Sequence, residues 1–140
     1  MSVRFRNYTD QAGLTPDYFR VRRFFVERGY AEFTYARWDW MATHSYLDRS
    51  AVRNIGLWEQ DDQIVAVAAF DCRLGEAFCL ALPGYEGLRG EMLRYAQDHL
   101  AADGRFGVYI SDADAAFQSG AAKLGYVATG QKENDAVFYP

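Results

Sequence analysis

The sequence predicts a mixed α/β domain: a mostly antiparallel sheet of about seven strands with helices on both faces. Three observations predict it. Hydrophobic patterns along the 140 residues read as strand, two helices, three strands, helix, strand, helix and two strands. Residues 64–70 form an unbroken apolar run, which indicates a central strand buried on both faces. The strand–helix–strand unit over residues 76–110 needs a crossover, so its two strands are expected to be parallel.

The N-terminal part is expected to form an edge strand and two helices. Residues 3–8 alternate in polarity, as edge strands do. Thr15, Pro16 and Asp17 predict a helix start, because Thr can cap, Pro fits the first helical position and Asp complements the helix dipole. A second helix is expected over residues 35–46.

Three antiparallel strands are expected next, over residues 54–59, 63–70 and 76–82, since short turns separate them. The C-terminal part predicts a helix, a strand, a helix and two strands. Their expected ranges are 86–102, 106–110, 114–123, 126–131 and 136–139. The chain shows no repeats or linkers, so residues 1–140 are expected to be a single domain.

Composition limits the classes of partner. A net charge of -4 and a pI near 5.1 argue against binding to nucleic acid or to an anionic membrane, which need a cationic surface. The arginines concentrated in the N-terminal part could form a local anion site or a solvated helix face. Cys72 and Cys79 are too few for a disulfide framework. No apolar run is long enough to span a bilayer, so a soluble, cytoplasmic protein is expected.

Several phrases, in order along the chain, suggest a family. They are IGLWE at 55–59 with IVAV at 64–67, LPGYEG at 82–87 before a long helix, and KLGY at 123–126. Together they resemble the GNAT superfamily of N-acetyltransferases, and the resemblance covers essentially the whole chain. It implies transfer of an acetyl group from acetyl-CoA to an amine by direct attack in a ternary complex.

The family's coenzyme loop reads Arg/Gln-x-x-Gly-x-Gly/Ala, in which glycines let the backbone approach a pyrophosphate and free amides bind it. Here those positions fall on Glu86, Arg89 and Glu91, so the motif is degenerate, and two carboxylates oppose an anion. The alternative is a loop that only turns the chain and starts a helix. By resemblance the acetyl-CoA contacts are assigned to Leu82, Gly87, Leu88, Arg89 and Gly90.

The catalytic groups are also assigned by resemblance. The family often places a Tyr, which protonates the departing thiolate, at the position of Ala121, and Tyr109 is the nearest substitute acid. Glu76 is the first candidate for the general base, with Glu59 and Asp71 behind it. The alternative for all three carboxylates is a strand-end charge in solvent.

The segment 33–46 is rich in aromatic residues where the family shapes its acceptor cleft. Tyr35 and Trp38 are assigned to the substrate on this basis, because aromatic walls suit an apolar or cationic ligand. Packing on the sheet and a subunit interface are the alternatives. His44 and His99 have no clustered partners, so no metal site is expected.

The leading hypothesis is therefore an N-acetyltransferase acting on an unidentified small-molecule amine. The alternative is a catalytically inactive module of the same fold, a pseudo-acetyltransferase or ligand sensor that takes no amine substrate. Such a module could pair with an identical subunit or with a partner acetyltransferase domain.

Overall fold

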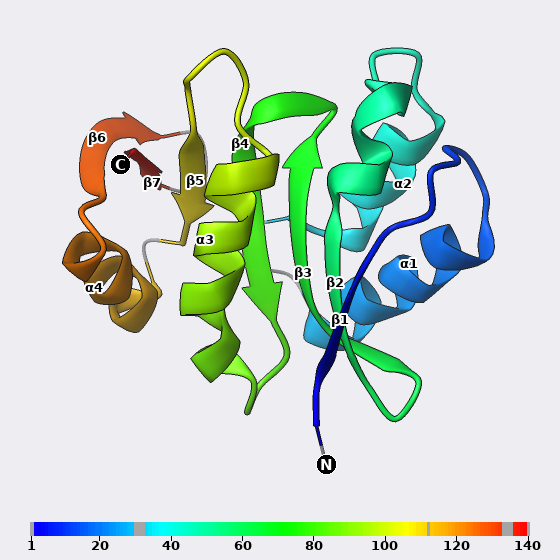
Figure 1. Cartoon of the computed structure of the whole chain (residues 1–140), viewed down its shortest axis with the longest axis horizontal. Helices are drawn as coiled ribbons and strands as arrows, with labels where there is room; N and C mark the ends of the chain where they lie inside the picture. The colour runs from blue at the N-terminus through cyan, green and yellow to red at the C-terminus, as the bar shows by residue number, and fades with distance from the viewer. Residues whose placement is uncertain (1, 30–32, 112, 133–135, 140) are drawn as a thin grey trace.

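One sheet organises the molecule (Figure 1). The computed structural model describes residues 2–29, 33–111, 113–132 and 136–139. Within them seven strands pair in the order β1-β2-β3-β4-β5-β7-β6. The strands are β1 Arg4–Asn7, β2 Gly56–Gln60, β3 Gln63–Asp71, β4 Arg73–Ala81, β5 Gly107–Ile110, β6 Val127–Lys132 and β7 Ala136–Tyr139.

The sheet is mixed, as the sequence predicts. In the described part of the chain, β4 and β5 pair in parallel and every other neighbouring pair is antiparallel. The parallel register runs from Glu76 opposite Gly107 to Phe78 opposite Tyr109. β4 continues to Ala81, three residues beyond Phe78, so its last part is not paired with β5.

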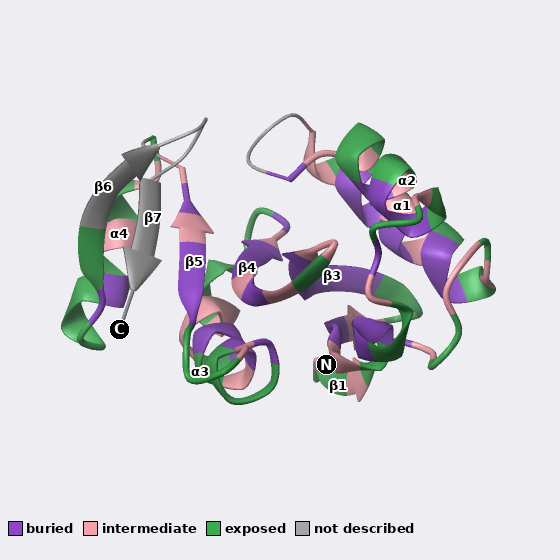
Figure 2. Ribbon diagram, turned by 90° about the horizontal axis from the view of Figure 1, so that it is seen from above, coloured by how far each residue is buried: buried purple, intermediate pink, exposed green. Residues whose placement is uncertain are grey.

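Helices cover both faces of the sheet (Figure 2). α1 Pro16–Arg28 and α2 Tyr35–Thr43 lie on one side, and α3 Arg89–His99 lies on the other with α4 Ala115–Lys123 against it. Thr15 caps α1 by accepting a hydrogen bond from the Tyr18 amide, as its residue type predicts. None of the helices in the described segments is long and apolar enough to cross a membrane.

Several expected boundaries differ. α2 ends at Thr43 rather than at residue 46, β4 begins at Arg73 rather than at residue 76, and α3 ends at His99 rather than at residue 102. The strand expected from residue 54 begins at Gly56, because a 3₁₀ helix occupies Arg49–Asn54 and Asp48 caps it. The helix expected from residue 86 begins with a 3₁₀ turn, Glu86–Leu88, before α3. The strand at Gly56 follows the end of a 3₁₀ helix and α3 follows a 3₁₀ turn, so in both places a short 3₁₀ segment occupies the expected boundary.

The core lies on both faces of β3, whose residues Ile64 to Phe70 are all buried, as its apolar run predicts. On one face, Phe25 of α1 contacts Trp38 of α2 and Phe33, and Phe33 contacts Phe78 of β4. On the opposite face, α3 buries Met92, Leu93 and Ala96 against the sheet, and Leu100, which directly follows the helix, is also buried.

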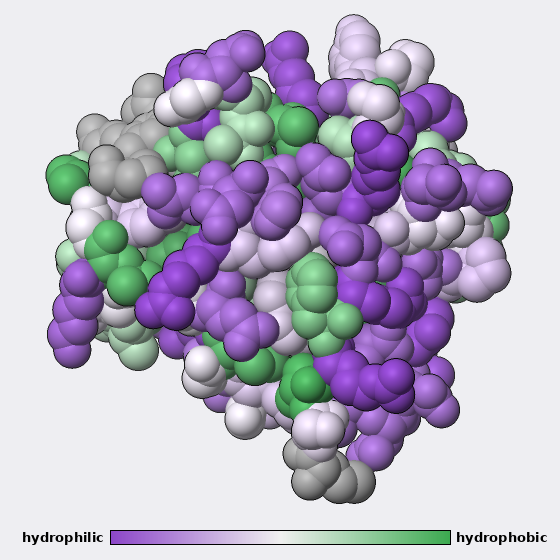
Figure 3. Space-filling view, viewed as in Figure 1, coloured by the Kyte–Doolittle hydropathy of each residue, from purple (hydrophilic) through white to green (hydrophobic). Residues whose placement is uncertain are grey.

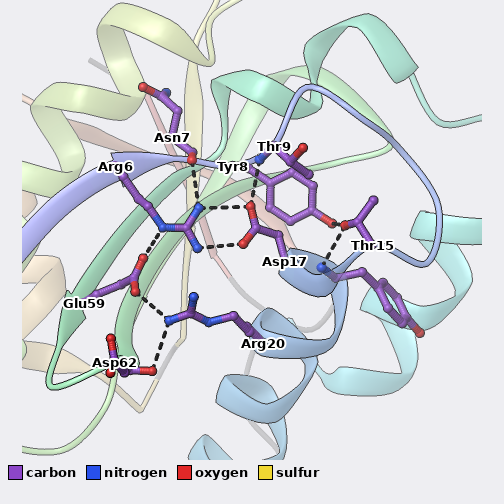
Figure 4. Close-up of polar contacts among 10 residues, drawn as sticks. Arg6, Asn7, Tyr8, Thr9, Thr15, Asp17, Arg20, Glu59 and Asp62 are labelled. Carbon is purple, nitrogen blue, oxygen red and sulfur yellow. Dashed lines mark hydrogen bonds and ion pairs between the residues drawn. The ribbon is translucent and has the colours of Figure 1, made fainter.

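The N-terminal arginines join structural elements rather than forming a cationic patch. Figure 4 shows Arg6 between two carboxylates: it donates to Asp17 at 2.9 and 2.6 Å and also to Glu59. Arg20 donates to the other oxygen of Glu59 at 2.6 Å. Arg22–Asp39 and Arg37–Asp71 also join different elements, whereas Arg23–Glu27 is an ion pair within α1. These contacts favour the helix-face interpretation over a local anion site.

Candidate functional site

An opening lies where β4 continues past its pairing with β5. The enclosed space is about 20 Å³, room for about one water molecule. Its lining brings together the end of β4, Tyr109 of β5, and the N-terminal ends of α3 and α4. The lining residues are Arg28, Cys79, Leu80, Ala81, Glu86, Arg89, Tyr109, Asp114 and Phe117.

A larger groove of about 160 Å³ lies between α3 and α4, and we call it the α3–α4 groove. Its lining is mostly apolar or small and ends at a charged rim. The residues are Glu86, Arg89, Gly90, Leu93, Ala116, Phe117, Gly120 and Leu124. The groove shares Glu86, Arg89 and Phe117 with the opening, so the two spaces adjoin. Side chains on the α3 side of the molecule are otherwise largely hydrophilic, with separate apolar spots (Figure 3).

The loop from Leu82 to Gly90 connects β4 to α3 and uses several of its amides internally. The Leu82 amide donates to the Val65 carbonyl at 2.9 Å. The Gly84 amide, at φ +92°, donates to the Glu86 carboxylate at 2.8 Å. The Leu88 and Arg89 amides donate to carbonyls of the preceding 3₁₀ turn. By the family resemblance the four amides of residues 87–90 are expected to face a pyrophosphate, and two of them, those of Leu88 and Arg89, have internal acceptors here.

Gly87 and Gly90 keep the backbone accessible. A Cβ added at either residue would meet no described atom within 4 Å. Gly90 also borders the α3–α4 groove. Gly90 therefore leaves open backbone beside the groove, and Gly87 leaves it open in the preceding turn, as a close-approaching ligand requires.

Arg89 supplies the guanidinium at the rim. Its Nη1 donates to Asp114 Oδ2 at 2.5 Å, and the side chains of the pair are 16% and 25% exposed. The same guanidinium lies over the Phe117 ring, 4.5 Å from its centroid. Asp114 uses its other oxygen to cap α4, accepting from the Phe117 amide at 3.0 Å. Arg89 thus links the starts of α3 and α4.

One expected electrostatic conflict is absent. Glu91, predicted to oppose an anion in the loop, accepts a hydrogen bond from the Trp58 indole at 2.6 Å instead. Trp58 belongs to β2 and is buried under α3, so Glu91 is directed toward the sheet. Neither space includes Glu91 in its lining. The prediction about Glu91 is corrected, and Glu86 remains as the acidic group of the loop.

The two predicted catalytic residues are placed differently. Tyr109 lines the opening and stacks on Phe78, with ring centroids 4.9 Å apart. Glu76 lies two residues before Phe78 on β4 and so faces the same side of the sheet. It is outside the lining of both spaces, about 10 Å along the strand from Cys79. Glu59 and Asp71 form the ion pairs with arginines described above, so both lie outside the site.

The predicted substrate residues lie outside both spaces. Trp38 is 1% exposed, and its indole donates to the Tyr18 carbonyl at 3.1 Å, which makes it a core residue. Tyr35 is half-buried, with the Arg22 guanidinium 5.1 Å from its ring centroid. For Trp38 the packing alternative describes the structure, because a helix laid on a sheet buries its largest aromatic residue.

Sequence reasoning missed most of the α4 side of the site. Asp114 was expected only as the capping residue of the helix over 114–123, and Phe117, Gly120 and Leu124 were not assigned to a site. Arg28 is one of the N-terminal arginines for which a local anion site or a solvated helix face was expected, and its Nε donates to the Ala81 carbonyl at 3.3 Å, at the opening. The apolar spacing within α4 was the available signal, but it does not say which helix lies opposite.

Sequence comparisons alone do not place this chain: no protein-family model matches it, and no curated protein matches its sequence. Solved structures do match over nearly the whole chain. Ribosomal-protein-S18-alanine N-acetyltransferase from Escherichia coli is 17% identical, with a TM-score of 0.63 over 99% of this chain and 92% of that one. A putative GNAT-family acetyltransferase from Desulfovibrio desulfuricans is 16% identical, with a TM-score of 0.64 over 99% and 97%.

A third match contains the coenzyme. PaiA N-acetyltransferase from Thermoplasma acidophilum, in complex with coenzyme A, is 12% identical, with a TM-score of 0.59 over 99% of this chain and 98% of that one. The chain therefore has the fold of the GNAT N-acetyltransferases, and the fold implied by the sequence resemblance is confirmed.

Proposed function

We propose that this chain is an N-acetyltransferase that binds acetyl-CoA along the α3–α4 groove and the adjoining opening at β4. The observation that supports it most is that the groove reaches the unpaired end of β4 through shared lining residues. A long ligand can lie between the helices and still present its end beside Tyr109. The coenzyme A complex of the Thermoplasma protein supports the choice of ligand.

The residues present suit such a ligand in three ways. Gly90 leaves open backbone beside the groove, Arg89 places a guanidinium at its rim, and apolar side chains line its floor. Arginine binds phosphate oxygens through two parallel hydrogen bonds. Acetyl-CoA when bound supplies a thioester whose carbonyl carbon an amine can attack.

Tyr109 and Glu76 are assigned the proton transfers. The amine nitrogen forms a bond to the carbonyl carbon, and the carbon–sulfur bond breaks. Tyr109 donates its hydroxyl proton to the departing sulfur, and Glu76 accepts the amine proton through water because it lies outside the opening. Cys79 takes no covalent part, since burial raises its pKa to about 12 and keeps it a neutral thiol.

A coenzyme-binding module without transfer is the second candidate. Two observations favour it: the Glu86 carboxylate occupies the Gly84 amide, and Ala121 stands where the family often has its tyrosine acid. The two candidates share the binding site and differ in turnover.

An acetylation assay separates the candidates. We expect purified protein with acetyl-CoA to release free coenzyme A thiol when supplied with the right member of an amine panel spanning polyamines, amino acids and peptide N-termini. Tyr109→Phe should lower kcat about 100-fold and leave the KM for acetyl-CoA nearly unchanged, because it removes an acid used only in the transition state. Equal rates for Tyr109→Phe would remove Tyr109 from the mechanism, and coenzyme A binding with no release for any amine would favour the module.

A further inference from the structure

We propose that the Arg89–Asp114 ion pair is a gate on the coenzyme site, in which Arg89 leaves Asp114 to bind the diphosphate. This inference rests on the proposed function and concerns how that site is controlled. It predicts that Asp114 and Glu86 weaken coenzyme binding, and that removing their charges strengthens it.

The first support is the position of Arg89. Its side chain borders both the opening and the α3–α4 groove, so the guanidinium can turn its donors from Asp114 toward a ligand in the groove while it stays in place. The Phe117 ring holds the guanidinium through a face contact that does not depend on Asp114. When the ion pair breaks, this ring keeps the charge beside the groove.

The second support is the local charge. The opening is lined by two arginines, Arg28 and Arg89, and by two acids, Glu86 and Asp114. A diphosphate bound at the rim that the opening shares with the α3–α4 groove adds negative charge beside this balanced set. It must compete with Asp114 for Arg89, and with the Glu86 carboxylate for the Gly84 amide. Each acid therefore occupies a donor that an anion would use.

Several substitutions would change the charge of a side chain at this site and keep its shape or its hydrogen-bond acceptor. Asp114→Asn keeps an oxygen to accept from the Phe117 amide, so the cap of α4 is retained while Arg89 loses its anionic partner. Glu86→Gln keeps an acceptor for the Gly84 amide. Arg89→Met keeps the alkyl chain and removes the guanidinium. Asp98→Asn, exposed in the last turn of α3, makes the same change in net charge at the other end of the helix.

The test is isothermal titration calorimetry of these variants with coenzyme A and with pantetheine, which lacks the diphosphate. We expect Asp114→Asn to bind coenzyme A about tenfold tighter and Glu86→Gln about twofold tighter, since Glu86 is exposed and screened. Arg89→Met should bind about tenfold more weakly. Pantetheine affinity should stay constant, and Asp98→Asn should match the wild-type protein for both ligands.

The outcomes separate the gate from the proposed function. If the wild-type protein binds coenzyme A and Asp114→Asn binds it equally or more weakly with an unchanged melting temperature, the gate is wrong and the proposed function stands. An equal gain for pantetheine would also overturn the gate, because the diphosphate would not be its target. If neither the wild-type protein nor either acid-to-amide variant binds millimolar coenzyme A, both proposals fail.

Discussion

Asp17 shows how single residues hold the N-terminal strand and helix together. Its carboxylate accepts two hydrogen bonds from Arg6 and one from the Thr9 amide, so β1, the loop after it and α1 meet at one side chain (Figure 4). The Arg6 guanidinium holds the pKa of Asp17 below its usual value near 3.8, against the opposing effect of burial. The network is structural and lies among β1, β2 and α1, away from the groove residues.

Asp17→Asn tests this account through pH. Because the folded-state pKa is depressed, the charged carboxylate stabilises the protein above the unfolded-state pKa near 3.9, and this stability is lost as the pH falls toward the folded pKa. We expect the variant to lose about 2 kcal/mol at pH 7, as for hydrogen bonds to charged groups. The difference from wild type should shrink as urea unfolding is repeated at about pH 4 and 3. A difference that is constant across this range would contradict the assignment.

At the scale of elements, the turn and helix start between β4 and α3 decide whether a ligand can approach. Gly84 is in the left-handed region at φ +92°, whereas Gly90 is in α3 with open space beyond its Cα. The first glycine is required by the turn, and the second is not required by the helix. A helix position held by glycine without a conformational reason is one that a ligand can explain.

These two glycines predict opposite effects on stability. Gly90→Ala should raise the free energy of unfolding by about 0.5 kcal/mol, because alanine loses less conformational entropy in a helix. Gly84→Ala should lower it by about 1 kcal/mol, because a Cβ is strained at positive φ. Urea unfolding of both variants gives the measurement. A destabilised Gly90→Ala would mean that the helix start is packed more tightly than its open surroundings indicate.

The elements also show what the sequence can predict. The caps at Thr15 and Asp114, the buried β3 and the parallel β4–β5 pair follow from local chemistry and periodicity. No element was expected over residues 49–53, because the 3₁₀ helix at Arg49–Asn54 has only two apolar residues, Ala51 and Val52, which is too few to form a periodic pattern. Arg89 was expected in the site, but its ion pair with Asp114 joins residues 25 apart in the chain, which no local pattern reveals.

At the scale of the whole molecule, the sheet positions the site because the pairing of β4 with β5 ends before β4 does. Phe78 is the last residue of β4 that pairs with β5, and β4 continues for three more residues. The helices that follow these two strands, α3 and α4, lie against each other on one face of the sheet. The opening and the α3–α4 groove adjoin at that place. The layered arrangement thus forms a path from between the helices to the centre of the sheet.

Calorimetric titration of coenzyme A into the wild-type protein and Gly90→Asp tests the central claim, that this path binds the coenzyme. We expect one binding site in the wild-type protein and at least a tenfold loss in Gly90→Asp, which places a carboxylate beside the groove without a steric clash. Gly90→Ala is the control that adds a Cβ without a charge, and it should bind coenzyme A more weakly than the wild-type protein but more tightly than Gly90→Asp. Binding that Gly90→Asp leaves unchanged, or no binding to the wild-type protein at millimolar coenzyme A, would contradict the claim.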